Sequence, residues 1–207
     1  QDYRNNQLAT IYLTDFKRDL VTDTITLAER IKYNEHFVKT IDTIFFTLAT
    51  KKKLTEKELL AFNRRHIAIM RESYFIPEKI TIRQFESSNS SHLLKSKLLK
   101  DKLFQYYTIN DRYEENVETS IQLFQHSFFT RDFMRPLITG DYIMLLSGSS
   151  LNRPLLDLDK LRNSDDYISS LFHKRGISEE QNIGYEKNKT MAKDLIEIIN
   201  SELENEK

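Results

Sequence analysis

The 207-residue chain contains no cysteine and no tryptophan, and it has only four glycines and three prolines. The lack of cysteine excludes both a disulfide framework and thiolate chemistry. No glycine precedes Gly140 and only Pro77 precedes Pro136, so little interrupts regular structure in the first two thirds of the chain. The sequence also lacks a signal peptide and any run of about 20 apolar residues, so it shows no segment expected to span a membrane.

Excess charge of either sign is also missing. The sequence has 31 Lys+Arg residues and 31 Asp+Glu residues, which gives a net charge of zero. Because proteins bind nucleic acid largely through cationic side chains that displace counterions, we expect no nucleic-acid partner. The 39% hydrophobic and 30% charged composition is typical of a folded domain, and we expect one domain over residues 1–207.

Residues at spacings of three and four form a long repeat near the start of the chain. They are Leu13, Phe16, Leu20, Thr24, Leu27, Ile31, Asn34, Val38, Ile41, Phe45 and Leu48. This period places one side chain per turn on a single helix face, and it predicts a helix over residues 3–50. So long a helix needs long packing partners, as in a helical bundle.

The same period predicts a second long helix over residues 92–134, stopped by Pro136. Its seam is Leu99, Leu103, Tyr106, Asn110, Tyr113, Val117, Ser120, Phe124 and Phe128. The period also predicts a C-terminal helix that begins at Ser178. Because the glycines gather between Pro136 and Gly184, we expect short helices and loops over residues 136–177. The predicted fold class is all-α: an elongated antiparallel helical bundle with two very long helices, a long C-terminal helix and short accessory helices. We expect helices 3–50 and 92–134 to pack antiparallel.

Local patterns predict where these helices begin and end. Three capping boxes are expected to start helices, at Thr55 with Glu58, Thr81 with Gln84 and Ser178 with Gln181. Ser90 or Ser91 is expected to cap the second long helix. The basic run Lys51 to Lys53 is expected to face the free carbonyls at the end of the first helix.

The middle of the chain resembles the central signature of an uncharacterised bacterial family. The residues that carry the resemblance are Tyr74, Phe75, Pro77, Phe85, Ser87, Ser88, Asn89, Leu94, Lys97, Leu99, Lys102, Tyr106 and Tyr107. Ser90 departs from it, because a small residue, commonly glycine, is expected in that turn. The resemblance implies a single transmembrane helix upstream of residue 1 and an extracytoplasmic helical domain at the cell membrane, in the periplasm. It implies no activity.

Titratable residues suggest two kinds of chemistry. Arg30 and His36 have a spacing similar to that of helical ribonucleases with composite sites, but a polar residue usually follows the arginine, where this chain has Ile31. Asp15, Asp19 and Asp23 share a helix face and could hold a hard cation; a solvated surface stripe is the alternative that we favour. The histidines are His36, His66, His92, His126 and His173. None shows the paired spacing of metal sites on helices, so we expect no metal and no cofactor.

Polar residues on the two apolar seams are the remaining candidates. Thr24, Asn34, Asn110 and Ser120 are expected to find buried partners, and they could fix helix register or line a small-molecule pocket. Tyr106 lies on the same seam and is expected in the core.

Three functions remain open. The favoured one is a non-enzymatic extracytoplasmic domain of a single-pass membrane protein that binds a protein partner, associates with itself or scaffolds a complex. The alternative is a small-molecule-sensing bundle that resembles receptor sensor domains, although the polar end at Glu202 to Lys207 is unlike the helix by which such domains return to the membrane. A helical nuclease is the least favoured.

Overall fold

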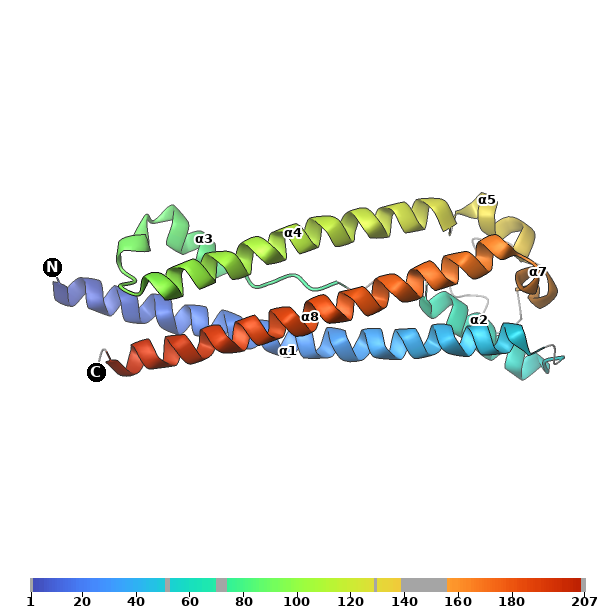
Figure 1. Ribbon diagram of the computed structural model, residues 1–207, viewed down its shortest axis with the longest axis horizontal. Coiled ribbons are helices and arrows are strands. Elements are labelled where there is room, and N and C mark those ends of the chain that lie inside the picture. The colour runs from blue at the N-terminus through green and yellow to red at the C-terminus, as the bar shows by residue number, and fades with distance from the viewer. Residues whose placement is uncertain (1, 51–52, 70–73, 129, 139–155, 206–207) are drawn as a thin grey trace. The chain divides into compact units, whose positions relative to one another are not determined.

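The computed structural model describes residues 2–50, 53–69, 74–128, 130–138 and 156–205. Its elements are α1 (Asp2–Ala49), α2 (Glu56–Ile69), α3 (Ile80–Ser87), η1 (Ser90–His92), α4 (Lys97–Phe128), α5 (Arg131–Met134), η2 (Arg135–Leu137), α7 (Leu158–Arg162) and α8 (Asp165–Asn205) (Figure 1). Across these ranges no β-strand forms, and Ile138 and Leu156 make an isolated bridge. The all-α fold class is therefore confirmed. None of the described helices is long and apolar enough to cross a membrane.

The chain forms two compact units. Unit 1 contains Gln1–Ile31, Tyr74–Asn116 and Ile183–Lys207, and unit 2 contains Lys32–Ser73 and Val117–Asn182. Each unit therefore combines stretches that are far apart in the sequence. Because the boundaries after Ile31, Asn116 and Asn182 fall inside long helices, no linker in the sequence marks them.

Unit 1 is built around an apolar core shared by α1, α3, α4 and α8. Its main buried residues are Leu13, Phe16, Leu20, Ile82, Phe85, Leu94, Leu99, Leu103, Tyr106, Tyr107, Ala192, Leu195 and Ile199. A second cluster joins Leu27, Ile31, Phe75 and Tyr185. The predicted seams of the first two long helices are therefore buried along unit 1, and Tyr106 lies in the core as expected.

Helices α1 and α4 run parallel in unit 1, so the antiparallel pairing predicted for them is wrong. The Lys95 ammonium, just before α4, donates a hydrogen bond to Asn6 Oδ1 at 3.1 Å, and the Tyr106 hydroxyl donates to Asp23 Oδ2 at 2.8 Å. Residue numbers thus rise in the same direction along both helices. The antiparallel partner of both helices is α8, which places Tyr185 with Leu27.

The reason for the parallel pairing is a return segment, defined here as residues 74–79, which leads into α3. Glu78 contacts Asp23, Thr81 contacts Asp19, and the Ser88 hydroxyl lies 2.9 Å from the Tyr12 hydroxyl. The connection therefore runs backwards along α1 before α4 begins. The antiparallel prediction did not anticipate that this connection returns along α1.

Ser90 and Ser91 do not cap α4 as predicted, because the helix starts later. Helix α4 begins at Lys97 rather than residue 92, and Ser96 Oγ accepts a hydrogen bond from the Leu99 N–H at 3.3 Å. Ser90 is instead buried in η1, with its hydroxyl 2.6 Å from that of Ser88. Asn89 precedes η1 in the left-handed conformation with φ 53°, which asparagine tolerates better than most residues. This conformation turns the chain before α4.

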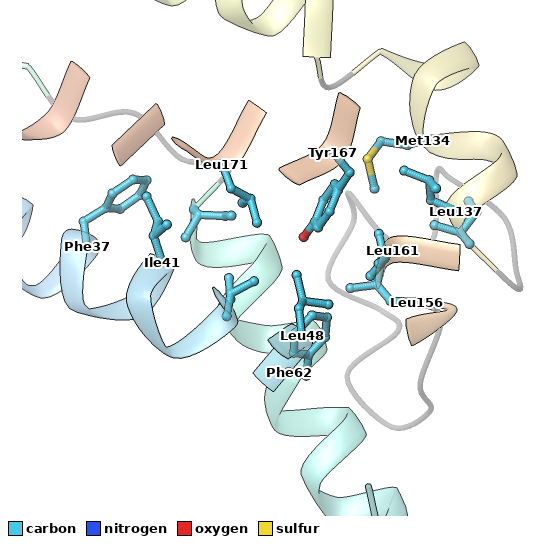
Figure 2. Close-up of a cluster of buried hydrophobic side chains, with 13 residues drawn as sticks. Phe37, Ile41, Leu48, Phe62, Met134, Leu137, Leu156, Leu161, Tyr167 and Leu171 are labelled. Carbon is cyan, nitrogen blue, oxygen red and sulfur yellow. The ribbon is translucent and has the colours of Figure 1, made fainter. Parts of the chain in front are cut away.

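Unit 2 has its own apolar core, drawn in Figure 2. Its buried residues are Phe37, Ile41, Ile44, Leu48, Phe62, Ile69, Met134, Leu137, Ile138, Leu156, Leu161, Tyr167 and Leu171 (Figure 2). Helices α1, α2 and α8 supply most of them, the short elements α5, η2 and α7 supply one each, and Ile138 and Leu156 come from the isolated bridge. The predicted seam residues Val117, Ser120, Phe124 and Phe128 have side chains outside the described residues.

Helix α8 begins at Asp165, thirteen positions before the predicted start at Ser178. Ser164 Oγ caps it by accepting from the Tyr167 N–H at 3.2 Å. Ser178 lies inside the helix and donates its hydroxyl to the Lys174 carbonyl at 3.1 Å, so the box predicted at Ser178 and Gln181 is wrong. The prediction failed because it took glycine as a loop signal, whereas Gly176 lies within α8.

The predictions for the end of α1 and the start of α2 have different outcomes. The box at Thr55 and Glu58 is confirmed, because Thr55 N–H donates to Glu58 Oε2 at 2.7 Å and Glu58 N–H donates to Thr55 Oγ1 at 3.3 Å. The end of α1 is capped by Arg162 of α7, whose Nη2 donates to the Thr50 carbonyl at 2.9 Å. The lysines predicted for that role include Lys51 and Lys52, which lie outside the described residues.

Candidate functional site

Two buried aspartates of α1, Asp19 and Asp23, lie one turn apart in unit 1. Asp19 and Asp23 are 3% and 2% exposed, so interpreting them as part of a solvated stripe is wrong. Asp15, one turn earlier, is partly exposed and pairs with Arg18 at 2.8 Å. The spacing of four places Asp19 and Asp23 on the side of α1 that the return segment covers.

The two carboxylates accept hydrogen bonds from backbone N–H groups that have no partner within a helix. Asp23 Oδ1 accepts from the Glu78 N–H at 2.8 Å, and Asp19 Oδ2 accepts from the Thr81 N–H at 3.2 Å. Thr81 lies in the first turn of α3, where N–H groups are free. The capping box predicted at Thr81 and Gln84 is therefore absent. The residue that precedes α3 makes no side-chain capping hydrogen bond, and Asp19 binds one of the free N–H groups of α3 instead.

Burial dominates the electrostatics of this site. It raises the pKa of Asp23 to about 6, against the hydrogen bonds from Glu78 and Tyr106, which favour the charged form. The charge of Asp19 raises that pKa further. Burial and the charge of Asp23 also raise the pKa of the Tyr106 and Tyr107 hydroxyls above the usual value. Both phenols therefore remain protonated donors at neutral pH.

Two buried hydroxyl groups lie beside these carboxylates without a hydrogen-bond partner among the described residues: the Thr81 Oγ1 and the Tyr107 hydroxyl. The Tyr107 ring lies 5.2 Å from the ring of Tyr106, which binds Asp23, and the charges of Asp23, Asp19 and Glu78 raise the pKa of the Tyr107 hydroxyl. Buried polar atoms are usually paired. Such a pair of hydroxyls therefore needs an explanation, and it distinguishes this site from an ordinary capping contact.

The predicted seam residues find separate partners. Asn34 is buried and donates Nδ2 to Gln181 Oε1 at 3.3 Å. Asn110 is buried, donates Nδ2 to the Tyr106 carbonyl at 2.8 Å and accepts from Asn188 Nδ2 at 2.7 Å. Thr24 is half-buried, and its hydroxyl donates to the Val21 carbonyl of its own helix at 2.8 Å.

The described geometry therefore links Asn34 and Asn110 to helix α8, whereas Thr24 bonds within α1. Ser120 lies in α4, and its side chain is outside the described residues. Whether these residues fix register or contact a ligand stays a prediction. A groove of about 160 Å³ lies between α4 and α8 in unit 1, lined by Lys102, Gln105, Met191, Asp194 and Leu195. That volume is smaller than that of most small-molecule pockets.

The other titratable candidates are placed as follows. His36, His92 and His173 are exposed, His66 is buried, and the side chain of His126 lies outside the described residues. Arg30 belongs to unit 1 and is half-buried, whereas His36 belongs to unit 2. Among the described residues no group of three or more His, Cys, Asp or Glu side chains is arranged to hold a metal ion.

His66 of α2 is a fully buried titratable residue of unit 2. Its Nδ1 lies 2.8 Å from the Tyr167 hydroxyl, and Figure 2 shows Tyr167 reaching from α8 into the core. Burial lowers the pKa of His66 to about 4, so the ring is neutral at pH 7. Asn63, one turn earlier on α2, accepts from the Leu156 N–H at 3.3 Å. These contacts tie α2 to later parts of the chain.

Sequence reasoning missed several buried polar residues of α8. They are Ser170, Lys174, Ser178, Gln181 and Asn188. A signal for them exists: the three-four spacing of Ile199, Leu195 and Ala192 continues backwards through Asn188, Tyr185 and Gln181. Polar residues on that seam concealed it, and an apolar-only pattern stops at Ala192.

Unit 2 also carries an aromatic patch, defined here as the contacting pair Phe45 and Phe172 together with Phe46, the next residue of α1. The rings of Phe45 and Phe172 lie 4.3 Å apart between centroids. Phe172 is 61% exposed and Phe46 is 71% exposed, whereas Phe45 is half-buried and packs on the unit 2 core. Phe45 therefore connects the patch to that core, which gives it a fixed base.

Charged residues lie one turn away from the aromatic patch on both helices. Arg175 Nε donates to Asp42 Oδ1 at 2.8 Å, and Arg175 Nη1 lies 2.7 Å from Glu179 Oε2. Comparisons of the chain with models of known protein families, with curated proteins and with solved structures gave no match.

Proposed function

We propose that this chain is a non-enzymatic helical domain that binds protein through the aromatic patch of unit 2, and that its partner is a second copy of itself. The observation that carries the proposal is the exposed Phe172 ring packed against the half-buried Phe45, with the exposed Phe46 as the next residue of α1. Aromatic side chains on a rigid base are the usual anchors of protein interfaces. Single exposed apolar residues are common, but a group of aromatic residues is a better candidate interface.

Charge favours a second copy as the occupant. Arg175 lies between Asp42 and Glu179 beside the patch, so the edge of the patch carries both signs. Under twofold symmetry the same surface faces itself, and Arg175 of one copy can approach the acidic residues of the other. A surface of one sign would repel its own copy, whereas a mixed edge is self-complementary.

The test is sedimentation equilibrium of the purified chain over a range of concentrations. We expect reversible dimerisation, and we expect Phe172→Ser and Phe46→Ser each to weaken it by more than about tenfold, because interface aromatics often contribute 2 kcal/mol or more. Ile183→Ser is the matched control, since Ile183 is 73% exposed but belongs to unit 1. A chain that stays monomeric, or dimers that all three substitutions leave intact, would contradict self-association through this patch.

The non-enzymatic part of the proposal is supported by the use of buried titratable groups. Asp19, Asp23 and His66 are engaged in hydrogen bonds inside the two units. We expect no RNA cleavage at concentrations where the dimer is populated. Cleavage that disappears in His36→Ala would instead support the helical nuclease, because a dimer can bring an arginine of one copy beside a histidine of the other.

The proposed location is the periplasmic side of the cell membrane, behind an upstream transmembrane helix. Its support is the resemblance of the segment from Tyr74 to Tyr107 to an extracytoplasmic family. A test is to fuse the full-length protein, at its C-terminus, to a reporter enzyme that is active only outside the cytoplasm. Activity of the fusion supports the location, and activity of a matching cytoplasmic reporter contradicts it.

A further inference from the structure

We propose that Asp19 and Asp23 bind a hard divalent cation of the calcium or magnesium type, with the hydroxyls of Thr81 and Tyr107 completing the polar surroundings. The site belongs entirely to unit 1, at the place where α1, the start of α3 and α4 meet. It is independent of the aromatic patch and of self-association.

The first reason is charge. Two carboxylates are buried one turn apart, and burying negative charge is costly unless a positive charge is near. Arg18 reaches Asp19 at 3.4 Å, but its side chain is 64% exposed, so solvent screens this pair. Lys79 is paired with Asp111 at 2.7 Å. The site therefore carries negative charge that its described side chains balance only in part.

The second reason is the pair of unpartnered hydroxyls. The Thr81 Oγ1 and the Tyr107 hydroxyl are both buried and have no hydrogen-bond partner among the described residues. Thr81 is fixed at the site because its N–H donates to Asp19. The threonine oxygen can coordinate a cation directly, and the tyrosine O–H can donate to a water molecule that the cation retains. A bound cation with its water would therefore give both hydroxyls a hydrogen-bond or coordination partner.

The third reason is the type of ligand atom. The site offers carboxylate and hydroxyl oxygens and no sulfur or imidazole nitrogen among its described side chains, a set that favours calcium or magnesium over zinc or copper. Two protein carboxylates are few for a calcium cage but sufficient for magnesium, which usually keeps several of its waters. The described residues contain no cluster of three or more acidic or histidine ligands, so the site would supply two carboxylates only.

Terbium luminescence tests the proposal on the whole chain. Terbium replaces calcium at oxygen sites and emits strongly when a tyrosine close to it is excited, and Tyr106 lies 2.8 Å from Asp23. We expect tyrosine-sensitised emission that calcium or magnesium displaces. We expect Asp23→Asn and Asp19→Asn each to weaken terbium binding by more than about tenfold, whereas Asp15→Asn on the same helix should leave it unchanged.

A second variant keeps the test valid if the aspartate variants fail to fold. Thr81→Val removes one hydroxyl without changing charge, and circular dichroism checks its fold. We expect calcium or magnesium to raise the thermal midpoint of the unmodified chain, as a ligand of the folded state does, and to raise that of Thr81→Val by less. Absence of sensitised emission, or emission that Thr81→Val and both aspartate variants leave unchanged, overturns the proposal.

Discussion

At the scale of single residues, Asn188 ties two long helices together through one buried amide. It donates to Asn110, which in turn donates to the Tyr106 carbonyl. We expect Asn188→Leu to lower the free energy of unfolding by about 1–3 kcal/mol, because the Asn110 oxygen then stays buried without its donor. Urea denaturation measures the change, and Asn116→Leu at an exposed position of α4 is the control.

The double variant separates this explanation from a packing effect. Replacing Asn110 and Asn188 together by leucine removes both partners, and paired removal is often far less costly than leaving one group unsatisfied. We expect the double variant to be more stable than the sum of the two single changes predicts. Strict additivity would show that the hydrogen bond between the two amides is not what stabilises the contact.

At the scale of the element, glycine inside helix α8 allows a simple gain in stability. An added Cβ at Gly176 would meet nothing within 4 Å, and alanine is favoured over glycine in a helix interior by about 1 kcal/mol. We expect Gly176→Ala to raise the free energy of unfolding by about that amount. The measurement is the urea midpoint at constant m-value, and a lowered midpoint would contradict an unstrained helix at this position.

Gly184 in the same helix provides the comparison. A Cβ there would lie 2.7 Å from Cε2 of the Tyr113 ring, so the ring must move before alanine fits. We expect Gly184→Ala to stabilise the chain less than Gly176→Ala, because the gain in helix propensity is offset by the displaced ring. Equal gains in the two variants would show that Tyr113 moves without cost.

The sequence predicts elements well where the deciding contacts are local. Thr55 and Glu58 are three residues apart and cap each other as predicted. Asp19 and Asp23, however, depend on N–H groups of Thr81 and Glu78, and no spacing within α1 indicates a partner 62 or 55 residues away. The same limit explains the direction of α4. The seams identify which face of each helix is buried, but the course of the connection decides whether two helices run parallel.

At the scale of the whole molecule, His66 makes one unit sensitive to acid. Its pKa in the folded chain is lowered to about 4, below the usual 6.5, so the unfolded chain takes up a proton first as the pH falls. Stability is therefore retained above pH 6.5 and is lost as the pH falls towards 4, by up to about 3 kcal/mol. We expect hydrogen exchange of unit 2 amides to show this loss of protection.

The control for the acid effect is His66→Gln. Glutamine does not titrate in this range but can still bond to Tyr167, so the variant should lose much of the pH dependence between 6.5 and 4 in unit 2. His36→Gln at an exposed position should leave the pH dependence unchanged. If His66→Gln loses protection on acidification as strongly as the unmodified chain, another group is responsible.

The way in which each unit combines distant segments has a consequence for synthesis on the ribosome. The last stretch of unit 2 ends at Asn182, whereas unit 1 also requires Ile183–Lys207. Residues 1–31 therefore cannot complete unit 1 until residues 183–207 have been translated. All segments of unit 2 are translated before the last segment of unit 1, although α1 begins in unit 1. Until then the unfinished unit 1 exposes apolar surface to which chaperones can bind.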